Sequence, residues 1–271
     1  MATMLKPKSH RVLVLCGPRM QTWHTAATLI EGGVNVVGVC IADQHMGGLP
    51  IAYLKRIMGK EGIVQAGGLI LGRLLYNVLN KRKDQASFNK LFNTQNIHQI
   101  IEAAPHTLHT KGQYHDSATK KWIESLAPDL IVAHTPYWVD KSIRDIPKVG
   151  IIGGHPGLTP NYRGSHSAFW AIYNGMPEDV GCSVFWLDSG VDTGPLIRQE
   201  RIPIAPGDSY VSLGWKGMIR QAEILRDVIL DFDKGIPIPK TPHNLIPEGS
   251  VYPPPTLIQY LKYRLKQNSV R

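Results

Sequence analysis

Short runs of apolar, mostly β-branched residues constrain the fold of this chain more than any other feature. They occupy residues 11–16, 35–42, 129–133 and 149–153. Runs of this length and composition predict strands buried on both faces, which is typical of a parallel sheet. A helical segment over 22–32, ended by Gly32 and Gly33, separates the first two runs. The chain therefore opens with a right-handed strand–helix–strand unit.

The remaining pattern extends this α/β arrangement. We expect a short helix or edge element over 97–104, a helix over 116–126, a later pair of strands over 182–187 and 196–204, and a long helix over 210–232 capped by Asp208 and Ser209. Alternating strands and helices predict a mostly parallel sheet with helices on both faces. The first turn carries only Gly17 and lacks the G-x-G-x-x-G spacing, which disfavours a dinucleotide site.

Cysteine usage and the N-terminus bear on the cellular compartment. Cys16, Cys40 and Cys182 lie far apart, each inside an apolar run, which favours buried reduced thiols in a cytoplasmic protein. Residues 1–10 have no apolar core of a signal peptide. We therefore expect a cytoplasmic location.

Positive charge is concentrated in one segment. The chain has a net charge of +9, and residues 55–90 hold eight basic and two acidic residues. Such a patch suits phosphate groups, an anionic cofactor or a membrane surface as well as RNA, and is equally consistent with a solvated helix face. The region 49–93 predicts an amphipathic helical insertion that packs over the domain or against a second subunit. The alternative is that this helical insertion lies on a membrane surface.

Two loop motifs carry the chemistry. Residues 150–164 read GIIGGHPGLTPNYRG and place His155 after a predicted strand, and residues 187–195 read LDSGVDTGP and place Asp192 on a glycine-flanked turn. A histidine and a carboxylate on sharp loops can move a proton during acyl transfer. His134 to Tyr137 also follow a predicted strand, so both histidine loops should face one crevice at the carboxyl ends of the strands.

On these motifs the chain resembles the formyltransferases that use 10-formyltetrahydrofolate. That family includes glycinamide ribonucleotide and methionyl-tRNA formyltransferases and the N-formyltransferases of nucleotide-linked amino sugars. The match covers about 127–235, with weaker agreement from residue 11. The resemblance implies a Rossmann-like formyltransferase fold, with a catalytic domain over 1–235, the insertion at about 49–93, and a short C-terminal extension over 236–271.

The resemblance also implies roles for individual residues. His155 and Asp192 would be catalytic. The folate co-substrate would contact Tyr137, Trp138, Val139, Leu187, Asp188, Gly190 and Val191. The binding site for the amine substrate would be formed by Asn161, Tyr162, Arg163 and Gly164. Arg163 would bind an anionic group or brace the loop. No metal is expected, because His106, His109 and His115 lie in a segment that reads as loop, without a cysteine.

One position departs from the family pattern. The family usually has asparagine two residues before the histidine, and this chain has Gly153. Three explanations compete: another group such as His134, Thr135, Asn161, His166 or a water replaces the amide, the enzyme uses another acyl donor, or the protein binds without much turnover. Loss of one such donor without replacement costs about 2.7–4 kcal/mol of barrier.

The expected function is transfer of a formyl group from 10-formyltetrahydrofolate to a primary amine. By analogy the acceptor is a nucleotide-linked amino sugar, because only some 35 residues follow Gly235, too few for the extra domain of a methionyl-tRNA enzyme. The alternatives are the same fold with a different acyl or one-carbon donor, and a catalytically weakened protein that binds folate or a nucleotide sugar. Expected partners are a small-molecule amine and, as a possibility, a second copy of the chain, with no nucleic acid.

Overall fold

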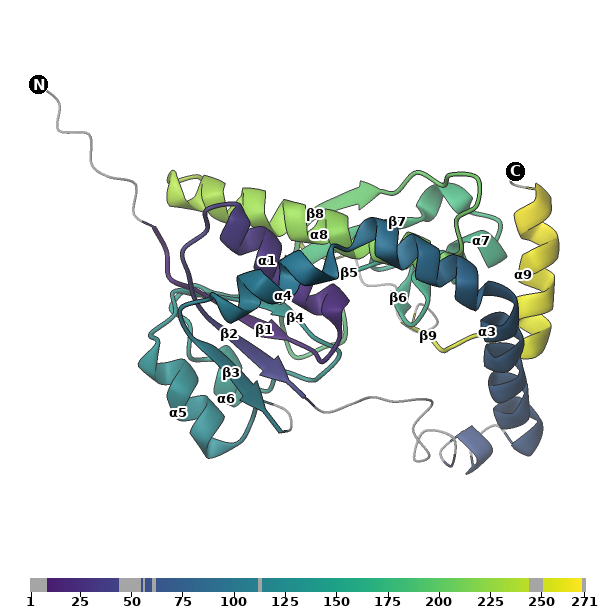
Figure 1. Cartoon of the computed structure of the whole chain (residues 1–271), viewed down its shortest axis with the longest axis horizontal. Helices are drawn as coiled ribbons and strands as arrows, with labels where there is room; N and C mark the ends of the chain where they lie inside the picture. The colour runs from purple at the N-terminus through teal and green to yellow at the C-terminus, as the bar shows by residue number, and fades with distance from the viewer. Residues whose placement is uncertain are drawn as a thin grey trace, which may run out of the picture.

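A seven-stranded sheet forms the centre of the molecule (Figure 1). The computed structural model describes residues 9–43, 55, 57–59, 62–111, 114–243 and 251–269. The sheet order is β3-β2-β1-β4-β5-β7-β8. The strands are β1 (Val12–Cys16), β2 (Val36–Ala42), β3 (Thr107–Thr110), β4 (Leu130–His134), β5 (Gly150–His155), β7 (Gly181–Trp186) and β8 (Leu196–Arg201). The first five pair in parallel, and β7 is antiparallel to both neighbours, which confirms the predicted mostly parallel α/β fold.

The register of the central strands brings the two histidine loops together. Cys16 pairs with His134, and Ala133 pairs with Gly153 on β5. Every residue of β1 and β4 is buried, as expected for interior parallel strands. The carboxyl ends of β1, β4 and β5 therefore meet at one edge of the sheet, as the sequence predicts.

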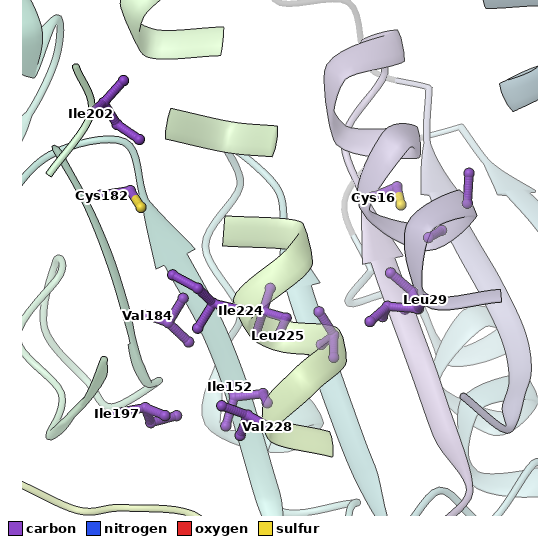
Figure 2. Packing of buried hydrophobic residues seen from close by; sticks show 14 of the residues in the cluster. Cys16, Leu29, Ile152, Cys182, Val184, Ile197, Ile202, Ile224, Leu225 and Val228 are labelled. Atoms are coloured by element: carbon purple, nitrogen blue, oxygen red, sulfur yellow. The ribbon is translucent and has the colours of Figure 1, made fainter. Parts of the chain in front are cut away.

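Helices cover both faces. On one face lie α1 (Met20–Glu31), α4 (Thr94–Glu102) and α8 (Tyr210–Asp233). Figure 2 shows Ile224, Leu225 and Val228 of α8 over the sheet residues Ile152 and Val184. The other face carries α5 (Ser117–Ser125) and α6 (Lys141–Arg144), whose Ile123 and Ile143 are fully buried. Ser209 begins α8 with a reciprocal capping box to Ser212, close to the predicted cap.

Two local predictions differ from the structure. The segment containing His106 and His109 is expected to be loop, but Thr107–Thr110 forms edge strand β3 beside β2. Its TLHT sequence has no apolar run, because an edge strand is paired on one side only and this one is largely unburied. For the helix or edge element expected over 97–104, the structure has a helix: residues 97–102 belong to α4, which begins at Thr94. Helix α1 begins at Met20 instead of residue 22.

The insertion and the C-terminal segment pack together. Helix α3 (Ile63–Leu91) lies against α8 and α9 (Leu257–Ser269). The Tyr76 ring lies 4.5 Å from Tyr210 and 5.5 Å from Tyr260, between centroids. The helical character of the insertion is thus confirmed over 63–91, while residues 49–54, 56, 60 and 61 lie outside the described residues. The domain boundary at 235 stays a prediction.

Further short elements tie the C-terminal segment to the middle of the chain. Strand β9 (Val251–Tyr252) pairs in parallel with β6 (Arg163–Gly164), in the loop that follows His155. Helix α7 (Ser167–Tyr173) and the 3-10 turn η1 (Pro177–Asp179) complete this region, and Trp170 Nε1 donates to the Pro253 carbonyl at 3.0 Å. The segment after residue 250 therefore folds back over the site loop.

Burial affects the chemistry of the cysteines. The three cysteines are unpaired and buried, and desolvation raises the pKa of Cys40 and Cys182 to about 12.

Across the described ranges, none of the helices combines the length and the apolar character that crossing a bilayer requires.

Candidate active site

A cavity of about 780 Å³ opens at the carboxyl edge of the sheet. This is the size of a site for a small organic ligand. The loops after β4 and β5 and the turn after β7 line it, so His155 and Asp192 share one cavity. The predicted folate residues all line it as well: Tyr137, Trp138, Val139, Leu187, Asp188, Gly190 and Val191.

His155 is buried and held through one ring nitrogen. Its Nε2 lies 3.0 Å from the Tyr162 carbonyl oxygen and 2.7 Å from Ser167 Oγ. A carbonyl only accepts, so Nε2 carries a proton and donates. Nδ1 lies 3.4 Å from Oδ2 of Asp192. The Tyr162 carbonyl and the Ser167 hydroxyl therefore hold the ring through Nε2, and the Asp192 carboxylate faces Nδ1.

Asp192 is held by the loop around it. Its backbone has φ 54°, the left-handed region that few non-glycine residues adopt. The Gly164 amide donates to Oδ2 across 3.4 Å. Arg163 Nη1 donates to the Val191 carbonyl, also at 3.4 Å. The loop around β6 thus fixes the position of the carboxylate next to His155.

Two segments form the predicted folate side. Thr135 Oγ1 accepts from the Tyr137 amide at 3.2 Å and orders the first turn. Trp138 is 46% exposed at the cavity and presents an aromatic surface there. In the second segment, Asp188 Oδ1 accepts from the Gly190 amide at 2.8 Å and from Thr193 Oγ1 at 2.6 Å. A turn closed in this way leaves the apolar Leu187 and Val191 to line the cavity.

The predicted amine side is only partly in the cavity. Gly164 lines it, whereas Asn161, Tyr162 and Arg163 do not. Asn161 is exposed, and Tyr162 is buried and stacks on Tyr252 with ring centroids 5.8 Å apart. Arg163 is buried as well. Its bond to Val191 favours the bracing role over direct binding of an anion.

Gly153 is packed too tightly to carry a side chain. A Cβ there would lie 2.7 Å from the Ala133 carbonyl oxygen and 2.7 Å from Leu187 Cδ1. Backbone of the neighbouring strand cannot move away cheaply, so asparagine does not fit this position without a shift of β4 or β5. The absence of the amide is therefore a consequence of how the two strands pack and is not a simple deletion from an otherwise unchanged site.

Of the groups that could replace the amide, His134, Thr135 and His166 line the cavity and Asn161 does not. His134 ends β4, next to the register partner of Gly153. Its Nδ1 lies 2.5 Å from Thr25 Oγ1, and burial, with a smaller contribution from His24, lowers the pKa of His134 to about 4. His134 is therefore neutral near pH 7.

Several cavity residues were not predicted from the sequence. They come from the start of α1, from α3 and from the C-terminal segment: Arg19, Thr22, Leu69, Gly72, Arg73, Tyr76, Asn77, Pro254, Pro255 and Tyr260. The excess of basic residues in 55–90 is the one signal that points to Arg73. The others are brought to the site by long-range packing that no local pattern reveals.

Two of the three histidines considered for zinc lie next to single carboxylates. His109 Nδ1 lies 3.2 Å from Asp43 Oδ1, and His115 Nδ1 lies 3.4 Å from Asp140 Oδ2. Within the part of the chain that the structure describes, no three His, Cys, Asp or Glu side chains gather closely enough to hold a metal ion.

The formyl transferase family model matches residues 76–229, more than half of the chain. The chain belongs to the formyltransferase family. The matched residues include both loop motifs and the strands β4, β5 and β7 that position them. The family resemblance of the sequence is thereby confirmed.

Curated relatives match this chain over limited stretches. A methionyl-tRNA formyltransferase of Synechococcus sp. (strain JA-3-3Ab) is 34% identical over 121 residues, 44% of this chain and 37% of the relative. A GDP-perosamine N-formyltransferase of Brucella melitensis biotype 1 is 36% identical over 111 residues, 41% of this chain and 42% of the relative. The chain thus spans less than half the length of these relatives.

Solved structures confirm the formyltransferase fold over most of the chain. A glycinamide ribonucleotide transformylase from Symbiobacterium toebii superimposes with a TM-score of 0.55 at 18% identity, covering 88% of this chain and 94% of that one. A 4-N formyltransferase from Francisella tularensis gives a TM-score of 0.51 at 16% identity, covering 90% and 75%. At these identities the likeness concerns the fold alone.

Proposed function

We propose that this formyltransferase moves a formyl group from 10-formyltetrahydrofolate to a primary amine. The observation that carries the proposal is the convergence of His155 and Asp192, 3.4 Å apart, in one cavity with the segments 137–139 and 187–191. The cavity volume and its apolar wall fit the folate, whose pterin would lie between these segments. When bound, the folate supplies the activated formyl group.

The chain's own groups handle the proton of the amine. We take His155 in the tautomer that donates from Nε2 to the Tyr162 carbonyl and has its lone pair on Nδ1, facing Asp192. Nδ1 accepts the proton that the attacking amine loses as the new C–N bond forms. The imidazolium is stabilised by the Asp192 carboxylate, and Nδ1 then returns the proton to the departing nitrogen.

We assign the missing donor for the formyl oxygen to His134. Nδ1 of His134 lies 2.5 Å from Thr25 Oγ1. The donor role requires the tautomer in which Nδ1 accepts from this hydroxyl and the proton is on Nε2. The formyl oxygen gains negative charge during the reaction and requires a hydrogen-bond donor. Neutral His134, held by α1 and placed at the cavity, can donate from its N–H group. His134 lies one residue beyond Ala133, the register partner of Gly153, and this position supports its role in place of the missing amide.

The acceptor that fits best is a nucleotide-linked amino sugar. Arg19 and Arg73 line the cavity, from the N-terminal cap of α1 and from α3. The pKa of His166, in the same cavity, is lowered to about 4 by desolvation and then by the positive charges of these two residues. Two guanidinium groups that act on one part of the cavity suit the phosphates of such an acceptor. The relative from Brucella melitensis, a GDP-perosamine N-formyltransferase, supports the same substrate class.

The crowding at Gly153 keeps two other functions open. A site without the amide also suits a different acyl donor, or a protein that binds folate or a nucleotide sugar with little turnover. Calorimetry with a stable folate analogue, combined with mass spectrometry of amino-sugar nucleotides after incubation with 10-formyltetrahydrofolate, separates the three. We expect binding and formylation. Binding without product would favour the binding protein, and neither binding nor product would favour another donor.

A further inference from the structure

Exposed apolar side chains are concentrated on two neighbouring helices. Of the sixteen exposed large hydrophobic residues among those described, ten lie on α3 and α9. On α3 they are Ile63, Val64, Ile70, Leu71, Leu74, Val78 and Leu79, and on α9 they are Ile258, Leu261 and Leu265. Val64 is 90% exposed, and Val78 81%. A concentration of this kind marks a contact surface.

The exposed apolar residues of α3 recur at helical spacing. Positions 63, 67, 70, 71, 74 and 78 lie on one side of the helix and form one stripe. The other side of the helix is buried through Ala66, Leu69, Gly72 and Tyr76. A Cβ on Gly72 would lie 2.7 Å from the Leu257 amide nitrogen, so α3 and the start of α9 pack backbone to backbone. The apolar stripe is therefore the outer face of a helix fixed to the body.

The charge around this surface is positive. Residues 55–90 and 256–271 together hold twelve basic and two acidic residues, which leaves eighteen basic and nineteen acidic residues in the rest of the chain. The net positive charge thus resides in these two segments. Among the described residues, Lys81, Arg82, Lys262 and Arg264 form no ion pair with a carboxylate.

The one carboxylate of the two helices points inward. Asp84 is the single acidic residue of α3, and α9 has none. Asp84 accepts hydrogen bonds from Tyr76 Oη at 2.6 Å and from Ser209 Oγ at 2.7 Å. Its carboxylate is therefore bound to groups of the protein itself. The outer face consequently offers apolar groups and cations and no exposed carboxylate of its own helices.

We propose that α3 and α9 seat the protein on an anionic lipid surface. Apolar side chains at the level of the acyl boundary and lysine or arginine at the head groups are the two contributions that hold an interfacial helix. A second copy of the chain is less suitable, because it would place another positively charged surface against this one, whereas an anionic lipid surface is complementary in charge. Since the inner face of α3 lines the cavity with Leu69, Arg73 and Tyr76, the site would lie about one helix diameter, ~10 Å, from the lipid.

The test is cosedimentation of the full chain with vesicles. We expect binding to phosphatidylcholine vesicles that contain phosphatidylglycerol, weaker binding to phosphatidylcholine alone, and loss at high salt. The double variant Leu71→Gln, Leu74→Gln should abolish binding. Lys81→Gln with Arg82→Gln should weaken it about 30-fold, from roughly fivefold for each basic residue near the surface.

Matched control variants remove apolar or cationic side chains that lie outside α3 and α9. Met176→Gln with Ile236→Gln changes exposed apolar residues outside the two helices, and Lys121→Gln with Arg198→Gln removes two exposed cations. Both should bind vesicles like the unmodified chain. Absence of vesicle binding, or equal loss in the control variants, would overturn the proposal. So would a dimer by analytical ultracentrifugation that dissociates in the Leu71, Leu74 variant, because a second copy would then cover the face. None of these measurements depends on turnover, so they stand apart from the formylation assay.

Discussion

His155 and Asp192 face each other through one nitrogen only. Nδ1 lies 3.4 Å from Oδ2 of Asp192, and Nε2 is held on the opposite side of the ring by the Tyr162 carbonyl at 3.0 Å. The ring is therefore fixed in orientation by main chain, and the carboxylate is left to act on the charge of the ring. This division of roles makes the two residues separable by substitution.

Replacing Asp192 by asparagine should lower the turnover rate by about 10²–10⁴, the usual contribution of an acid–base group. The asparagine side chain would keep an oxygen for the Gly164 amide, so the loop and the affinity for a folate analogue should remain. Steady-state formylation and calorimetry check both points. A turnover rate within a few-fold of the original would remove the carboxylate from the mechanism.

His155→Gln should eliminate measurable formylation while the protein stays folded. The glutamine amide can donate to the Tyr162 carbonyl as Nε2 does, but it has no group that accepts a proton at the position of Nδ1. Product detection by mass spectrometry and thermal melting test this pair of outcomes. Substantial product from a folded variant would contradict the proton-transfer role.

Gly153→Ala should destabilise the protein by about 1–3 kcal/mol, because the added methyl meets the Ala133 carbonyl and Leu187. Gly214→Ala is the control. It lies in α8 with nothing within 4 Å of its Cβ and should stabilise by about 0.5–1 kcal/mol. Urea unfolding of both variants measures the contrast. Equal stability of the two would show that the strands are not in close contact at Gly153.

His134 should make the fold sensitive to acid. Its pKa falls from 6.5 to about 4 on folding, so the unfolded chain binds the proton first as pH decreases. The contribution of the neutral ring is complete above pH 6.5 and is lost as pH falls towards 4. By linkage it amounts to about 3 kcal/mol. His134→Gln should flatten the stability curve over that window, and superimposable pH profiles of the two proteins would refute the assignment.

Arg73→Gln should raise the KM for a nucleotide-linked acceptor about tenfold or more and leave kcat within a few-fold, since the guanidinium lies at the cavity but takes no part in the proton transfer. Lys81→Gln on the same helix removes a cation outside the cavity and should leave KM unchanged. Identical KM values for both variants would argue against an anionic acceptor at Arg73.

Local sequence patterns were sufficient for the interior strands of the sheet and for placing His155 and Asp192 at one cavity. Strands such as Val12–Cys16 are predictable because burial on both faces demands an unbroken apolar run, and His155 lies at the end of another such strand. Edge strand β3 was not predictable, since Thr107–Thr110 is only partly buried and carries no such run.

The far wall of the cavity could not be predicted, because it depends on contacts between distant segments. Tyr76 meets Tyr260, and Asn80 Nδ2 donates to Tyr260 Oη at 2.8 Å across 180 residues of sequence. The orientation of the His155 ring was equally hidden, since Nε2 is held by a backbone carbonyl whose direction no side-chain motif encodes.

The return of the chain over its own site has a consequence for biosynthesis. Pro254, Pro255 and Tyr260 close the cavity that β4 and β5 open more than a hundred residues earlier. A nascent polypeptide can assemble the sheet while still attached to the ribosome, but it gains a complete reaction chamber only after Tyr260 has emerged from the exit tunnel. Competence for substrate therefore follows the formation of the sheet during synthesis of this protein.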